Sequence, residues 1–161
     1  MLSEEIGFGG SCHWCTEAIF QTLKGVSKVR QGWISIREDE AFHEGVIVEF
    51  RPDQIPLKIL IEVHLLTHSS TSEHKLRKRY RSAIYAFSSD QQEAAKRILL
   101  DLQKHFTRPL ITKSYRFKEF KTSAETFQNY YRKNPDKPFC KSYIDPKLKL
   151  IFKDFSTFIK S

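Results

Sequence analysis

The sequence predicts an α+β fold, specifically a two-layer sandwich with a split βαβ (ferredoxin-like) core and C-terminal additions. Short stretches rich in β-branched residues alternate with stretches of helical periodicity, in the order strand, helix, two strands, helix, strand, helix, strand. Glycine and proline separate these stretches, and no internal repeat or low-complexity linker interrupts them. We therefore expect residues 1–161 to form a single domain with one hydrophobic core.

The first half of the chain carries three strand signals and two helix signals. Gly25 ends the first predicted helix, and Pro52 ends the predicted strand 44–50. Pro56 stands where the second helix begins, since proline suits the first turn of a helix. The predicted strands are 5–8, 26–33 and 44–50, and the predicted helices are 14–23 and 56–66.

The second half continues the alternation. Ser88 or Ser89 can cap a helix whose apolar residues recur at helical spacing as far as Leu102. Pro109 then prevents the helix from continuing, and another strand is expected after it. The predicted strands are 81–87 and 110–114, and further helices are expected over 123–133 and 146–159.

Composition narrows the classes of function. The net charge is +8, but the excess is concentrated, above all in residues 74–81, and is not interleaved with exposed aromatics. The basic run indicates a solvated face or an anion site, and nucleic-acid binding is disfavoured. No stretch approaches the length of a membrane span, and residues 1–8 lack the features of a signal peptide, so we expect a cytoplasmic protein without membrane association.

Two of the three cysteines, Cys12 and Cys15, form a C-x-x-C pair directly after Gly9 and Gly10. The glycines allow a tight turn, so Cys12 is expected at the start of a helix, where unpaired N–H groups favour a thiolate. In a reducing compartment, such a pair with an odd third cysteine indicates redox or metal chemistry.

Five segments resemble motifs of the A-type peptide methionine sulfoxide reductases. The first, G-G-S-C-H-W-C-T-E-A-I-F, is similar to the family signature G-G-x-C-F-W-C/G-x-E-x-x-F, and Y-R-S-A-I-Y is identical to an internal family motif. The others resemble E-x-V-x-I-x-Y-D-P, H-Q-x-Y-Y-x-K-N-P and G-Y-C. In chain order the five segments are residues 9–20, 44–52, 80–85, 128–135 and 139–140.

The resemblance implies that Cys12 attacks the sulfur of an S-configured methionine sulfoxide, either free or in a peptide. Methionine is released and Cys12 becomes a sulfenic acid. Glu44 matches the family's general acid, which protonates the sulfoxide oxygen and needs an apolar setting to do so. Phe42 or Trp14 is expected to help supply that setting.

Three further residues match positions that bind the substrate. Trp14 matches the tryptophan that forms one wall of the methyl slot, and Tyr80 matches a tyrosine that reaches the sulfoxide oxygen. His13 stands where the family has the phenylalanine of the other wall, which adds polarity and a possible charge.

The resemblance also implies a second thiol that reduces the sulfenic acid. Cys15 can act locally, Cys140 matches the family's C-terminal recycling cysteine, and a relay through both is possible. We expect Cys140 on a mobile tail. Thioredoxin or a glutaredoxin is the expected electron donor, and no cofactor is expected.

The chain departs from the family in two loops. Residues 34–43 replace a longer loop that carries a second tyrosine, and residues 69–79 replace the G-N-D-x-G-T-Q loop with a basic stretch that lacks its aspartate. Phe127 also replaces a histidine. These changes suggest a diverged paralogue that accepts a smaller or anionic sulfoxide, with His43 or His74 replacing a lost donor.

Two other classes of function stay open. A binding module is possible, retaining the fold and recognising sulfoxides or anions without efficient turnover. A zinc site is possible if Cys12, Cys15 and His13 join Cys140 or His43, although the chain has only one C-x-x-C pair.

Overall fold

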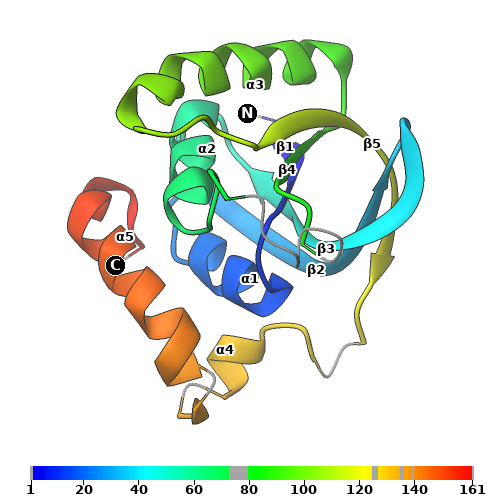
Figure 1. Cartoon of the computed structure of the whole chain (residues 1–161). Helices are drawn as coiled ribbons and strands as arrows, with labels where there is room; N and C mark the ends of the chain where they lie inside the picture. The colour runs from blue at the N-terminus through cyan, green and yellow to red at the C-terminus, as the bar shows by residue number, and fades with distance from the viewer. Residues whose placement is uncertain (1, 73–79, 125–126, 135, 139, 161) are drawn as a thin grey trace.

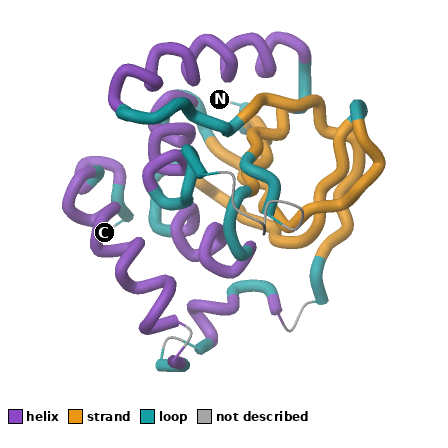
Figure 2. Tube along the Cα trace, in the orientation of Figure 1, coloured by secondary structure: helices purple, strands orange, loops and turns teal. Residues whose placement is uncertain are grey.

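The computed structural model describes residues 2–72, 80–124, 127–134, 136–138 and 140–160. Five strands form a closed barrel, in the order β1, β3, β2, β5, β4, with β4 returning to β1. Figure 1 shows α1 and α2 between the barrel and α5, while α3 lies across one end, and Figure 2 shows the strands curling together on one side of the molecule. The strands are β1 (Glu4–Gly9), β2 (Val26–Ile36), β3 (Asp39–Phe50), β4 (Ala83–Ala86) and β5 (Lys113–Thr122).

The order of the strands follows from the helices that join them. Helix α1 (His13–Gln21) connects β1 to β2, and β3 lies between these two strands, antiparallel to both. Helix α2 (Leu57–Leu66) leads from β3 toward β4, which pairs antiparallel with β1. Helix α3 (Ser89–Leu102) then returns the chain to β5, which runs parallel to β4 and antiparallel to β2.

The closure by β5 corrects the prediction of a two-layer sandwich. An open sheet would leave β2 and β4 as edges, whereas β5 pairs with both of them. A closed barrel satisfies the backbone groups that edge strands leave unpaired. The expectation of a mixed fold with a five-stranded sheet and C-terminal helices is confirmed.

Alternation along the strands builds two separate cores. Val46 and Val48 of β3 pack in the main core beneath the helices, while Ile47 faces the other way into a smaller cluster. Ile84 of β4 likewise belongs to the main core, and its neighbours Ala83 and Tyr85 to the smaller one. The helices therefore cover one face of the strands, and apolar side chains fill the other.

Local signals explain where several elements begin and end. Gly25 has φ +84°, and a Cβ there would lie 2.8 Å from the Ile55 side chain, so only glycine fits after α1. Ser88 caps α3, because its hydroxyl accepts a hydrogen bond from the Gln91 N–H at 3.1 Å.

Two predicted elements were misplaced. The strand expected over 110–114 lies further along, as β5, because Leu110 and Ile111 donate their N–H groups to the Gln103 side chain and the Ser70 carbonyl. The helix expected over 123–133 is reduced to α4 (Tyr130–Lys133). Asn129 has φ +58°, a left-handed conformation that interrupts a helix.

The C-terminal segment packs back onto α1. A π-helical turn (Cys140–Ile144) leads into α5 (Asp145–Asp154), and a short 3-10 turn (Ser156–Phe158) follows. Leu148 and Ile151 of α5 are buried in the main core. None of the helices in the described ranges combines the length and hydropathy needed to cross a membrane.

Candidate active site

The turn between β1 and α1 presents Cys12. Gly10 has φ +145°, and a Cβ there would lie 2.5 Å from the His68 ring, so this close approach requires glycine. Cys12 is the N-cap residue of α1, and its carbonyl accepts hydrogen bonds from the N–H groups of Cys15 and Thr16. The predicted position of Cys12 at a helix start is confirmed.

The two thiols of the C-x-x-C pair have opposite tendencies to ionise. The Cys15 thiol donates a hydrogen bond to the Cys12 sulfur and lowers the pKa of Cys12, with help from the N–H groups of Trp14 and Cys15. Burial and the Glu44 charge oppose this shift. The same hydrogen bond, together with burial, raises the pKa of Cys15. Cys12 is therefore the more acidic thiol of the pair, and Cys15 is the less acidic one.

A cavity of about 650 Å³ opens beside Cys12. Its size is suitable for a small molecule or an extended side chain. Three elements meet there, namely the turn before α1, the end of α2 and the start of α5. The lining includes Cys12, Cys15, His68, Tyr80, Tyr143 and Lys147.

Glu44 lies on β3 and is 3% exposed. Its Oε1 accepts a hydrogen bond from the His13 N–H at 3.3 Å, and the His13 Nδ1 lies 3.4 Å from the same oxygen. Because His13 follows Cys12 directly, these contacts hold the carboxyl at the first turn of α1. Glu44 is not among the residues that line the cavity, although its charge acts on Cys12.

His13 is 7% exposed and points toward β2 and β3. Its Nδ1 lies 3.2 Å from the Gly32 carbonyl, an acceptor, so this nitrogen carries a proton. The ring also meets Trp33 edge-on, with centroids 5.4 Å apart. The structure thus pairs His13 with Glu44.

Trp14 points toward the C-terminal segment. Its ring stacks on Tyr130 at 4.1 Å and lies 5.8 Å from Phe127, the residue at the family's histidine position. One face of the indole is therefore covered.

Cys140 is fully buried at the start of the π-helical turn. Burial raises the pKa of its thiol, and the Asp145 charge adds to the shift. Cys140 acts electrostatically on Cys15 but is not among the residues lining the cavity. In this structure Cys140 therefore lies in a packed segment, and its charge acts on Cys15.

Sequence reasoning missed the role of Glu17, which lies within the first motif. Its carboxylate is fully buried and accepts hydrogen bonds from the Asn129 N–H at 2.8 Å, the Tyr130 N–H at 3.1 Å and the Gln31 amide at 2.8 Å. Glu17 therefore fastens the segment before α4 to α1. The charged residue within an otherwise apolar helical stretch was the available signal.

Sequence reasoning also missed His68, which lines the cavity and packs against Gly10. Its Nδ1 donates to the His64 carbonyl at 2.5 Å, and its Nε2 lies 2.7 Å from the Ser82 hydroxyl, which is 2.6 Å from the Thr112 hydroxyl. His64 in turn binds the Gly9 carbonyl at 2.7 Å. The two histidines thus connect the end of α2 to the turn that carries Cys12.

The other predicted donors and metal ligands are dispersed. His43 lies on β3 opposite Ile34, and His74 falls outside the described residues. Within the described ranges, no three side chains of histidine, cysteine, aspartate or glutamate come together as metal ligands. The zinc hypothesis therefore has no ligand set in the described part of the chain.

Comparison with known proteins decides the family. A profile of the family described as "Peptide methionine sulfoxide reductase" matches residues 4–157. The chain belongs to this family. The chain is 33% identical to the peptide methionine sulfoxide reductase MsrA of Deinococcus radiodurans, and the match covers 90% of this chain and 79% of that protein.

Solved structures of other proteins share the fold. Mxr1 from Saccharomyces cerevisiae in reduced form has a TM-score of 0.75 at 20% identity, and the match covers 88% of this chain and 91% of that one. Mxr1 in complex with Trx2 has a TM-score of 0.62 at 20% identity, covering 80% and 84%. At 20% sequence identity, these two matches show a shared fold.

The rebuilt loop between β2 and β3 is visible in the structure. Only a two-residue turn, residues 37–38, joins β2 and β3, so this segment of the chain forms a tight hairpin. Much of the second rebuilt loop, residues 73–79, lies outside the described residues.

Proposed function

We propose that this peptide methionine sulfoxide reductase family member is a thiol-dependent oxidoreductase that reduces S-configured methionine sulfoxide, free or in peptides. The observation that carries the proposal is the lowered pKa of Cys12 beside an open cavity, with the Glu44 carboxyl held at the same helix turn. A nucleophile and an acid thus converge from positions far apart in the sequence.

In the first step the Cys12 thiolate attacks the sulfoxide sulfur, and the Glu44 proton moves to the sulfoxide oxygen. The oxygen passes to Cys12 as a sulfenic acid, and the electron pair returns to the methionine sulfur. Methionine is reduced by two electrons and Cys12 is oxidised by two. The His13 N–H, which already binds Glu44, stabilises the carboxylate that this step leaves behind.

Trp14 and Tyr80 are the proposed substrate contacts, with the methyl group against the indole and the oxygen near the Tyr80 hydroxyl. Tyr80 lines the cavity beside Cys12, which supports this role. His13 occupies the second wall position of the family. Its hydrogen-bonding geometry supports a part in orienting Glu44 as well.

We propose that both remaining cysteines resolve the sulfenic acid in sequence. Cys15 attacks Cys12, water leaves, and a Cys12–Cys15 disulfide forms. Cys140 then attacks Cys15, which frees Cys12 and moves the disulfide toward the C-terminal segment. The hydrogen bond between Cys15 and Cys12, and the electrostatic effect of Cys140 on Cys15, support this order.

Peptide mapping after one turnover tests the relay. A Cys140→Ser variant should accumulate the Cys12–Cys15 disulfide, and the intact chain should accumulate Cys15–Cys140. A direct Cys12–Cys140 disulfide in a Cys15→Ser variant, formed at the rate of the intact chain, would contradict the relay.

Thioredoxin is the proposed electron donor, with a glutaredoxin as the second choice. The complex of Mxr1 with Trx2 supports the first, since that relative belongs to the same family. The cytoplasm is the proposed compartment, supported by three cysteines that are all free thiols.

At the level of the fold, residues 1–161 are proposed as one domain. The helix α1 between β1 and β2, with β3 inserted between these strands, supports a split βαβ (ferredoxin-like) core. The strand β5 is then the addition that closes the barrel.

Turnover with separated sulfoxide epimers tests the function. With thioredoxin and its reductase supplied, methionine S-sulfoxide should be consumed and the R epimer left intact. Consumption of the R epimer alone, or of neither, would refute the assignment.

One observation favours a narrower substrate class, namely a free anionic sulfoxide. Lys147 lines the cavity beside Cys12 and supplies a cation for a carboxylate. N-acetyl-methionine S-sulfoxide, which carries a carboxylate and no ammonium, should therefore be reduced faster than its neutral methyl ester, and a Lys147→Gln variant should lose that preference. A preference for the neutral compound would leave the general function intact and remove this refinement. Binding of sulfoxide without turnover would point to the binding module.

A further inference from the structure

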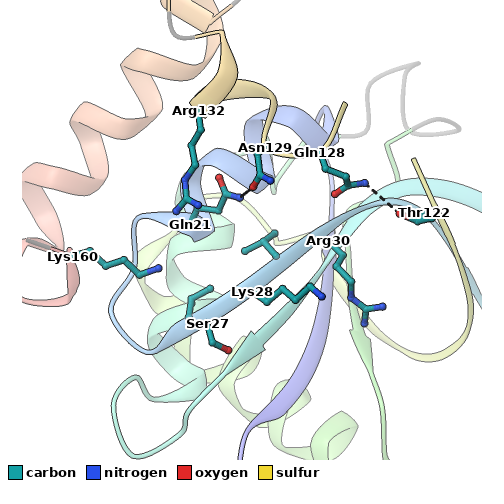
Figure 3. A pocket seen from close by; sticks show the side chains of 11 residues that line it. Gln21, Ser27, Lys28, Arg30, Thr122, Gln128, Asn129, Arg132 and Lys160 are labelled. Atoms are coloured by element: carbon teal, nitrogen blue, oxygen red, sulfur yellow. Dashed lines mark hydrogen bonds between the residues drawn. The ribbon is translucent and has the colours of Figure 1, made fainter. Parts of the chain in front are cut away.

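A second pocket lies at the opposite end of α1 from Cys12. It has a volume of about 470 Å³ and is bordered by β2, α4 and the C-terminal residues. Figure 3 shows the side chains of Gln21, Asn129, Arg132 and Lys160 around the end of α1, with Lys28 and Arg30 along β2. Among the described residues that line the pocket, Lys28, Arg30, Arg132 and Lys160 are cationic and none is an aspartate or glutamate.

Separate tethers fix the backbones that carry these cations. Lys28 and Arg30 lie on β2, which pairs with β3 along its length. Arg132 lies on α4, whose first residues are held by the buried Glu17 carboxylate. The N–H of Lys160 donates to the Thr22 carbonyl at 2.8 Å, so the chain end is joined to the end of α1.

The described residues balance this positive charge only in part, since the charge of Arg132 acts on the buried Glu17 carboxylate. Arg30 forms an ion pair with Glu5 at 2.7 Å. In the described ranges, Lys28, Arg132 and Lys160 form no salt bridge. Partial desolvation and the nearby positive charge of Arg132 lower the pKa of Lys160, as expected where two cations lie close together.

We propose that this pocket binds a small polyanion that carries phosphate or carboxylate groups. Arginine and lysine on three different elements would surround it, and the guanidinium of Arg132 can bind two of its oxygens at once. The site size matches that of known small-molecule pockets. Bound anion would also link the segment around α4 to β2.

The pocket is separate from the proposed chemistry. Cys12 precedes the first residue of α1 and Gln21 is its last, so the helix holds the two sites about 13 Å apart along its axis. None of the residues lining this pocket lines the cavity beside Cys12. Anion binding in this pocket is therefore independent of sulfoxide reduction at Cys12.

Calorimetric titration of the full chain with pyrophosphate and with citrate, at constant ionic strength, tests the proposal. We expect saturable binding of at least one of them, and the tighter of the two identifies phosphate or carboxylate as the recognised group. The double variant Arg132→Gln, Lys160→Gln should weaken binding about tenfold or more. If the double variant fails to fold, the single variant Lys160→Gln serves instead, because the Lys160 side chain is exposed. This single variant should also weaken anion binding.

A matched control separates a site from general attraction to a basic protein. Lys149→Gln with Lys153→Gln removes the same charge from exposed positions on α5 and should leave the affinity within about twofold. Absence of saturable binding, or an equal loss in the two double variants, would overturn the proposal.

Discussion

At the scale of single residues, the opposite pKa shifts of the two thiols in the C-x-x-C pair are the central feature. The Cys15 hydrogen bond is the largest influence that lowers the pKa of Cys12, ahead of the backbone N–H groups. The donor is itself a candidate resolving thiol. Activation of the nucleophile and its later reduction therefore depend on the same contact.

Replacement of Cys15 by alanine should raise the pKa of Cys12, because the main donor to its sulfur is lost. The rate of Cys12 alkylation by iodoacetamide, followed across pH by peptide mass, measures that pKa. A Cys15→Ser variant retains a hydrogen-bond donor and should lie nearer to the intact chain. Identical alkylation profiles for the two variants would show that the hydrogen bond is unimportant.

His68 is expected to position the nucleophile turn. A His68→Ala variant removes the ring that packs on Gly10 and the link to Ser82, and we expect kcat to fall about 10- to 100-fold with a smaller change in KM. The exposed His105→Ala variant is the control and should retain full turnover. An unchanged kcat in His68→Ala would contradict this role.

The candidate reacting residues could be predicted from the sequence, whereas the residues that hold them in place could not. The candidate reacting residues Cys12, Cys15 and Glu44 were identifiable from the motifs, because reacting groups must be specific residue types. The partners of His13 and His68 were not, since they depend on strands and turns that only the folded chain brings together.

At the scale of elements, the Glu17 carboxylate joins α1 to the segment that leads into α4. A carboxylate buried in this way favours its protonated form, and burial raises the pKa of Glu17 above its ordinary value of 4.5. The folded protein therefore holds this proton more tightly than the unfolded chain does.

The free energy of unfolding should consequently contain a component that falls as pH rises from about 4.5 through the raised pKa of Glu17. A Glu17→Gln variant should lack this component, and a control Glu93→Gln variant, at an exposed site on α3, should keep it. Urea denaturation over this pH range measures the slope. Equal slopes in Glu17→Gln and the intact chain would exclude the proposed ionisation.

Elements with strong local signals were predicted well, and those defined by tertiary partners were not. The alternation of β-branched residues located β3, and the Ser88 cap located α3. β5 carries many charged residues, and its position depends on pairing with β2 and β4. The apolar residues 110–111, which precede β5, were therefore wrongly predicted as part of a strand.

At the scale of the whole molecule, closure of the barrel and packing of the C-terminal segment bring three free cysteines into one region. Cys140 is buried within the C-terminal segment, where its charge acts on Cys15. Long-range closure of this kind could not be predicted from local sequence patterns, because the α4 to α5 segment contacts α1 across more than a hundred residues of chain.

The most direct test of the account is a single turnover of the purified chain with methionine S-sulfoxide and no external reductant. We expect one methionine to form and two thiols to be lost per chain, and neither change in a Cys12→Ser variant. Equal methionine release from Cys12→Ser, or no release from the intact chain, would contradict it.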